Sequence, residues 1–304
     1  MSYGDILKSI MKRNSAVVAL TAEARKALGT IPDEFPDRFY DFGIAEQNLV
    51  GAACGMAAMG KIPVIHVPLA AFVTMRPFEF IRTSGAMQGR NVKIPGLLPG
   101  FAAAFQGPTH VALEDISLMR GIPGMTVMEA SCEEDLKEVM EHAFAVKGCV
   151  YFRIPGEMPK GFNYCGKVSK IDQPRLLRKG KKGLVITSGT MTPIALSAVE
   201  MLAKEGLDLT LANLCVLDPA PEKELASLMA EFDKVATVEE HFITGGLGSI
   251  IAEIIADAGL GKKLLRVGVK DAFPDRYTTR MENLAYIGLD EKGIAKQLTG
   301  FFKN

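Results

Sequence analysis

The chain has 304 residues, roughly twice the length of a typical domain, so two domains are expected. Its 35 basic residues offset 35 acidic ones, which gives no electrostatic reason to expect a nucleic-acid partner or a membrane surface. Five cysteines without a Cys-x-x-Cys pair argue against a disulfide framework and against a zinc site. The first residues are amphipathic and do not resemble a signal peptide, so we expect a cytoplasmic protein.

Short apolar segments alternate with helical patterns along the chain, which is typical of an α/β fold with mostly parallel strands. Strands are predicted at 16–20, 63–67, 126–129, 149–154, 184–187, 207–211, 235–238 and 264–267. Ser131 and Glu134 predict a capping box, and Thr192-Pro193 predicts a helix start. The expected fold class is α/β with two doubly wound domains, each a mostly parallel sheet with helices on both faces.

A basic and irregular stretch interrupts this pattern between residues 164 and 183. We interpret it as an interdomain linker. The predicted domains are therefore 1–163 and 184–304, and each is large enough to bury its own core.

The segment before residue 50 has a strand end that runs through Gly43 into a helix with Glu46 in its first turn. Small residues follow in that helix, and they permit close approach of another element or chain. An acidic residue in a first turn is also what the helix dipole favours. The local pattern alone therefore does not assign a function to Glu46.

Two further segments have a similar ambiguity. Gly107-Pro108 before Thr109-His110 predicts a tight turn that presents the histidine at the mouth of a cleft, although a single loop histidine is more often an incidental surface residue. Phe72 and Phe78 can share one face of a helix or turn, where a core stripe is the alternative.

The segments DFGIAEQN and GPTH, with the small-residue helix between them, resemble the pyrimidine-binding domain of transketolases and 1-deoxyxylulose-5-phosphate synthases. The segments VEEH and GGLG resemble the C-terminal domain of the same family, so the resemblance covers nearly the whole chain. It implies a transferase that uses thiamine diphosphate with Mg²⁺. A phosphate site at the GGLG turn is the weaker alternative to a packing role.

The resemblance also implies roles for residues at the cofactor. Glu46 is expected to contact N1′ of the aminopyrimidine, where a shared proton favours the imino tautomer of the ring. An aromatic residue is expected to stack on that ring, with Phe78 the first choice and Phe72 the second. Arg76 is expected to have a structural role or to lie at a subunit contact.

On the substrate side, the resemblance implies that His110 is a catalytic residue that orients the substrate and carries a proton. Gln106 stands where transketolases carry an aspartate that reads substrate hydroxyls. Arg153 matches an arginine that the family uses on the substrate phosphate. Leu98 stands where a histidine is expected, and Glu23 where an aspartate is expected.

The family's diphosphate and metal site depends on a Gly-Asp-Gly motif, which this sequence lacks. The resemblance therefore implies a separate partner, an N-terminal transketolase subunit that carries the diphosphate-binding domain and supplies the metal ligands. An α2β2 heterotetramer is the simplest closed assembly of two such chains.

The resemblance implies transfer of a two-carbon ketol unit from a ketose, usually phosphorylated, to an aldose acceptor. The departures at Gln106 and Leu98 keep open a 2-oxo acid donor, as in a deoxyxylulose-phosphate synthase or a 2-oxoacid dehydrogenase beta subunit. A third interpretation is a non-catalytic binding or regulatory subunit. The joint presence of Glu46 and His110 argues against it.

Overall fold

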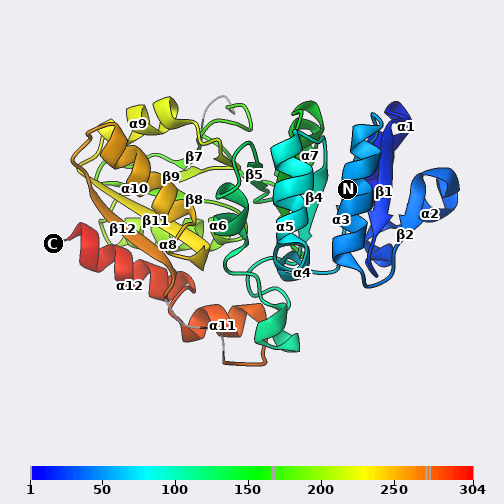
Figure 1. Ribbon diagram of the computed structural model, residues 1–304. Coiled ribbons are helices and arrows are strands. Elements are labelled where there is room, and N and C mark those ends of the chain that lie inside the picture. The colour runs from blue at the N-terminus through cyan, green and yellow to red at the C-terminus, as the bar shows by residue number, and fades with distance from the viewer. Residues whose placement is uncertain (1, 166–168, 271–272, 274, 304) are drawn as a thin grey trace.

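The computed structural model describes residues 2–165, 169–270, 273 and 275–303, and it contains two sheets that lie side by side (Figure 1). The first sheet has the strand order β10-β5-β6-β4-β3-β1-β2, and the second has the order β12-β11-β8-β9-β7. In the described part of the chain, the edge strands β10 and β7 are antiparallel to their neighbours, and all other strand pairs of the two sheets are parallel. The predicted α/β class, with two mostly parallel sheets, is confirmed.

The strands of the first sheet are β1 (Val17–Thr21), β2 (Phe39–Asp41), β3 (Ile62–His66), β4 (Lys93–Leu97), β5 (Thr126–Glu129), β6 (Val150–Ile154) and β10 (Val216–Asp218). The strands of the second sheet are β7 (Arg175–Arg178), β8 (Leu184–Thr187), β9 (Thr210–Asn213), β11 (Lys234–Phe242) and β12 (Lys263–Val269).

The helices around the first sheet are α1 (Tyr3–Arg13), α2 (Ile31–Glu34), α3 (Glu46–Ala58), α4 (Ala70–Met75), α5 (Phe78–Phe80), α6 (Asp115–Arg120) and α7 (Glu133–Ala145). Those of the second are α8 (Met191–Lys204), α9 (Glu222–Ala230), α10 (Leu247–Asp257), α11 (Arg280–Tyr286) and α12 (Glu291–Phe302).

The central strand β1 shows why these segments form a covered sheet. All five of its residues are buried, as expected for a parallel strand with helices on both faces. Val18 and Leu20 belong to one hydrophobic cluster, while Val17 and Ala19 belong to another on the opposite face. Helices α1 and α7 contribute to the second cluster, and α3 contributes to the first.

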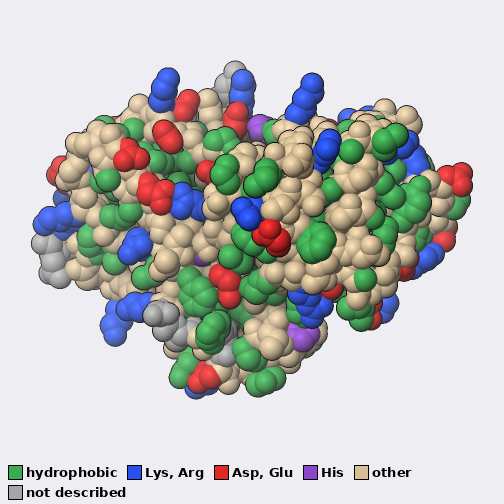
Figure 2. Space-filling view, in the orientation of Figure 1, with side chains coloured by type: hydrophobic (Ala, Val, Ile, Leu, Met, Phe, Trp, Pro, Cys, Tyr) green, Lys and Arg blue, Asp and Glu red, His purple; other side chains and the backbone are tan. Residues whose placement is uncertain are grey.

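The first cluster continues from the N-terminal sheet into the second domain, where it includes Leu184, Ile186 and Leu225. The two domains therefore share part of one core. Figure 2 shows positive and negative side chains interspersed on the face it displays. This mixture agrees with the balanced composition. No helix in the described ranges has the length and apolar character needed to cross a membrane.

Two parts of the sequence interpretation require correction at the domain boundary. The predicted linker contains β7, which pairs antiparallel with β9 at the edge of the second sheet. Its charged ends made it look irregular, but Arg175 is buried and Nη1 lies 3.0 Å from Asp135 Oδ1. Residues 166–168 of the predicted linker lie outside the described residues. The strand β10 comes from the C-terminal half, yet it completes the first sheet against β5.

The capping box predicted at Ser131 and Glu134 is wrong. Helix α7 begins at Glu133, and the Sγ atom of Cys132 accepts a hydrogen bond from the Asp135 N–H over 3.3 Å. Ser131 instead donates to Asn213 Oδ1 of the second domain over 2.9 Å. The predicted proline in the first turn of α8 is confirmed, since the helix begins at Met191.

Candidate active site

Glu46 is the first residue of α3, directly after the turn at Gly43. That glycine has a φ of 62°, and its N–H donates to Asp41 Oδ1 over 3.0 Å, so the turn redirects the chain from β2 into the helix. Glu46 is only 4% exposed. Its Oε1 accepts a hydrogen bond from Arg76 Nη1 over 2.5 Å. The site therefore contains a nearly buried carboxylate with a cationic partner.

Phe72 lies on α4, and Arg76 follows the end of that helix. The guanidinium carbon of Arg76 lies 3.6 Å from the Phe72 ring centroid, which is a close cation–π contact. The two residues are four positions apart, a spacing that places side chains on one helical face. Arg76 thus bridges the carboxylate of Glu46 and the ring of Phe72, while its own side chain is 42% exposed.

His110 reaches the same place from a different segment. It ends the short turn Pro108–His110, and its ring centroid lies 5.1 Å from that of Phe72 in an edge-on arrangement. Its Nδ1 lies 3.0 Å from Thr109 Oγ1. Gly107 starts the turn with a φ of 98°, and a Cβ there would lie 2.4 Å from Tyr277 Cε1. Only glycine fits this position.

The structure thus brings three of the sequence-predicted site residues together: Glu46, Phe72 and His110. Gln106 is exposed and lies at the end of the preceding turn, four residues before His110. Phe78 begins α5 and is half-buried against the first hydrophobic cluster. The sequence analysis did not place Arg76 at this site. The available signal was its spacing of four from Phe72.

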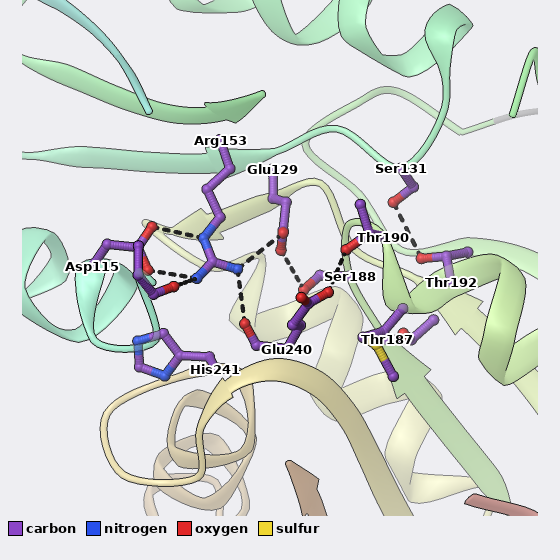
Figure 3. A network of polar contacts seen from close by, with 12 residues as sticks. Asp115, Glu129, Ser131, Arg153, Thr187, Ser188, Thr190, Thr192, Glu240 and His241 are labelled. Carbon is purple, nitrogen blue, oxygen red and sulfur yellow. Dashed lines mark hydrogen bonds and ion pairs between the residues drawn. The ribbon is translucent and has the colours of Figure 1, made fainter. Parts of the chain in front are cut away.

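Arg153 lies elsewhere, at the centre of a buried polar network between the two domains (Figure 3). It is 1% exposed, and Asp115 accepts from both Nε, at 2.8 Å, and Nη2, at 2.5 Å. Nη1 donates to Glu129 Oε1 and to the Glu240 carbonyl, and Nη2 also donates to the Ala112 carbonyl. All the N–H donors of this guanidinium are occupied. This contradicts the substrate-phosphate role expected for Arg153.

The charges of this network are mutually compensated. Burial acts to lower the pKa of Arg153, but the carboxylates of Asp115 and Glu129 outweigh it and raise that pKa well above its usual value. Burial acts to raise the pKa of Asp115, and Arg153 outweighs it and holds that pKa below its usual value. An ion pair of this kind is a structural feature of the domain boundary.

A cavity of about 610 Å³ opens at the carboxyl ends of β1, β4 and β6. Glu23, Leu98 and Ile154 lie on its wall, together with Lys8 and Lys26. Glu23 and Leu98 are the non-glycine residues with positive φ in the described chain, at 64° and 49°. Carboxyl ends of parallel strands are where α/β proteins bind ligands, and such strained residues are frequent at functional sites.

The VEEH and GGLG segments pack together in the second domain. Glu239 Oε1 accepts from the Gly248 N–H over 2.9 Å, so its carboxyl group caps the start of α10. Burial raises the pKa of Glu239 to about 8 and lowers the pKa of His241 to about 4. Since the Glu239 side chain occupies the helix N-terminus, the glycine-rich turn has a packing role.

Comparison with known proteins accounts for both halves of this architecture. The transketolase pyrimidine-binding domain matches residues 1–158, and the transketolase C-terminal domain matches residues 172–294. The chain belongs to the transketolase family, a family of thiamine-diphosphate transferases.

Two similar relatives and one solved structure are of comparable length. The putative transketolase C-terminal section of Methanocaldococcus jannaschii is 36% identical over 300 residues, which cover 97% of this chain and 93% of that protein. The 6-deoxy-6-sulfo-D-fructose transketolase subunit SqwH of Clostridium sp. (strain MSTE9) is 34% identical over 274 residues, covering 90% and 84%. A solved structure described as a split gene transketolase, inactive beta4 tetramer, superposes with a TM-score of 0.89 at 31% identity, covering 99% and 97%.

Proposed function

We propose that this chain is the pyrimidine-binding subunit of a split transketolase, which transfers a two-carbon ketol unit from a ketose to an aldose acceptor. The observation that carries the proposal is the convergence of Glu46, Phe72 and His110 at one site. The family membership and the relatives that are named as sections or subunits of transketolases support it.

The residues at the site fit an aminopyrimidine. Glu46 offers a buried carboxyl group that can share a proton with a ring nitrogen, and Phe72 offers an aromatic surface for stacking. Phe78, the first choice from the sequence, becomes the second candidate for stacking, because Phe72 is the ring that contacts His110 and Arg76. Thiamine diphosphate, when bound, supplies the carbanion chemistry that breaks and forms the C–C bond.

The protein residues orient the reactants and handle protons. Glu46 holds a proton at N1′ of the aminopyrimidine. His110 orients the oxygens of the substrate and transfers a proton to or from them. Gln106 has an exposed side chain close to His110 in sequence, so it can bind a substrate hydroxyl group.

We infer that a second subunit supplies the remainder of the site. The described residues contain no group of three His, Cys, Asp or Glu side chains suited to hold a metal ion. The family's diphosphate and metal site depends on a Gly-Asp-Gly motif that this sequence lacks, so we assign the diphosphate and the Mg²⁺ ligands to an N-terminal transketolase subunit. The small residues of α3 offer a surface for close contact, and an α2β2 assembly is the simplest closed form.

Calorimetric titration with thiamine diphosphate and Mg²⁺ tests this proposal on this chain alone, on the partner alone and on their mixture. Tight binding by the mixture, with much weaker binding by each chain, is the expected result. Equally tight binding by this chain alone would contradict the shared site.

A 2-oxo acid is the second candidate for the donor. It is favoured by the position of Leu98 on the cavity wall, where the family resemblance led us to expect a histidine for the sugar phosphate. Turnover by the assembled pair on a panel of ketoses, ketose phosphates and 2-oxo acids separates the two donors. A panel in which only 2-oxo acids react would replace the ketol-transfer proposal.

A further inference from the structure

His110 is carried by a closed loop that begins at Gly100 and ends at Ala112. The two residues exchange hydrogen bonds, with the Gly100 N–H 2.9 Å from the Ala112 carbonyl and the Ala112 N–H 3.1 Å from the Gly100 carbonyl. Within the loop, successive tight turns are closed by bonds such as that from the His110 N–H to the Gly107 carbonyl at 3.0 Å. Because the turns follow one another directly, a shift at the base of the loop is transmitted to His110.

The C-terminal domain holds the base of this loop. Glu240 Oε1 accepts a hydrogen bond from the Phe101 N–H over 2.8 Å. At the other end of the loop, just after Ala112, the Leu113 carbonyl accepts a hydrogen bond from the Phe242 N–H over 2.8 Å. Glu240 and Phe242 both lie on β11, so a single strand of the second domain contacts both ends of the loop.

The carboxylate of Glu240 is itself fixed in place. It is 3% exposed, and Thr190 Oγ1 donates to its Oε2 over 2.8 Å. Arg280 Nε lies 3.1 Å from Oε1 and 2.9 Å from Oε2. Figure 3 shows Glu240 beside Thr190, with its backbone carbonyl joined to Arg153. The acceptor that binds Phe101 is therefore held by side chains of its own domain.

Gly100 fits this arrangement closely. Its φ is 62°, and a Cβ at this position would lie 2.4 Å from Glu240 Oε1. A glycine therefore allows the backbone to approach the carboxylate at the point where the loop begins.

We infer that Glu240 is a positioning residue, which holds Phe101 and thereby places His110 for the substrate. The inference rests on the proposed function of His110. A reacting group displaced by about 1 Å can lose about 100-fold in rate, so the anchoring of this loop has a catalytic consequence. The role is distinct from general adhesion between the domains.

The interdomain ion pair between Arg120 and Glu253 provides a control. Arg120 on α6 binds Glu253 on α10, with Nη1–Oε1 at 3.1 Å and Nη2–Oε2 at 2.5 Å. This pair also joins the two domains, but its carboxylate lies on α10, is 55% exposed and pairs with Arg120 instead of the loop. Glu240→Ala and Glu253→Ala therefore both remove an interdomain carboxylate, and only the first releases the loop.

The test compares these two variants in the full chain and in the assembly with the partner. Hydrogen exchange followed by mass spectrometry measures the amides of residues 101–113 in the chain alone. We expect about ten-fold faster exchange there in Glu240→Ala and no change in Glu253→Ala. In the assembly, kcat/KM should fall by about 10- to 100-fold in Glu240→Ala while the dissociation constant for thiamine diphosphate changes by less than about two-fold.

Two outcomes overturn the inference: equal behaviour of the two variants, or faster loop exchange without a fall in kcat/KM. If Glu240→Ala does not fold, Gly100→Ala replaces it, because its added methyl group disturbs the same contact and leaves the buried charges paired. Failure of the wild-type assembly to bind thiamine diphosphate would instead overturn the proposed function. The exchange measurement does not depend on that function, so the two failures are distinguishable.

Discussion

Arg76 lies against both of the groups that suit an aminopyrimidine: its Nη1 is 2.5 Å from Glu46 Oε1, and its guanidinium carbon is 3.6 Å from the Phe72 ring centroid. In this conformation Arg76 occupies a face of the ring and an oxygen of the carboxylate. A cofactor that uses the same two surfaces has to displace it. The half-exposed side chain has room to move toward solvent.

Removal of Arg76 should therefore strengthen cofactor binding. For Arg76→Met in the assembled enzyme we expect about five-fold tighter binding of thiamine diphosphate, because a partly exposed ion pair contributes about 1 kcal/mol. Calorimetry measures the affinity. Arg25→Met is the control, since Arg25 also pairs with a carboxylate, Asp33 at 3.4 Å, and also lies over a phenylalanine. Weaker binding by Arg76→Met would mean that Arg76 holds the cofactor.

Replacement of Glu46 should impair catalysis without unfolding the protein. Glu46→Ala should reduce kcat of the assembled enzyme by about 100-fold or more, since proton transfer by a positioned carboxyl group contributes about 10²- to 10⁴-fold. Circular dichroism of the isolated chain should be unchanged. Glu79→Ala, which removes an exposed carboxylate on the neighbouring α5, is the control and should retain full activity. Near-normal turnover by Glu46→Ala would show that the assignment is wrong.

Replacement of Arg153 should lower the stability of the protein and leave its affinity for substrate unchanged. Arg153→Met leaves the buried carboxylates of Asp115 and Glu129 without their cation, and loss of one member of a buried ion pair costs about 3–5 kcal/mol. Denaturant unfolding of the isolated chain measures this loss. A variant of unchanged stability that bound phosphorylated donors less tightly would restore the phosphate-binding role.

The pKa of Glu239 predicts a pH dependence of stability. Burial raises it to about 8, whereas the unfolded glutamate has a pKa near 4.5, so the folded state binds the additional proton between these values. The contribution of Glu239 to the free energy of unfolding is largest below pH 4.5. It falls as the pH rises toward 8, with a slope of at most about 1.4 kcal/mol per pH unit. Glu239→Gln should flatten this slope.

The window for that measurement is pH 6.5–8. Burial lowers the pKa values of His66 and His241 to about 4, from 6.5 in the unfolded chain. These groups therefore add stability as the pH rises to 6.5 and contribute little change above it. Burial also lowers the pKa of Lys93 to about 8, so Lys93 adds stability as the pH approaches 8. Glu239 is therefore isolated by comparing wild type with Glu239→Gln, each unfolded in denaturant at pH 6.5 and at pH 8. The prediction would be contradicted if the free energy of unfolding changed by the same amount between these pH values in wild type and in Glu239→Gln.

The sequence predicted the strands that consist mostly of buried apolar residues, such as β1 and β8. It missed β4, whose segment contains Lys93, Pro95 and Gly96, because that composition is unusual for a buried strand. Lys93 is accommodated there since its Nζ donates to the carbonyls of Val146 and Gly148. Such compensation comes from distant parts of the chain, and local patterns do not contain it.

The same limit applies to the candidate site. Glu46, Phe72 and His110 were identified as separate segments, and the structure adds their proximity. Arg76 was expected to be structural or at a subunit contact, and its spacing of four residues from Phe72 predicts a shared face but not the stacked contact. Arg153 was assigned to the substrate phosphate because it matches an arginine of the family, whereas its five donors are used by groups from both domains.

The strand β10 has a consequence for attempts to divide the chain. Its residues come from the C-terminal half, but they pair with Met128 and Val127 at the edge of the N-terminal sheet. A fragment that ends at residue 163 would leave β5 as an open edge, and unpaired edges promote aggregation. Chimaeras between relatives therefore need to exchange 216–218 together with the first sheet, because the chain cannot be divided cleanly at the predicted domain boundary.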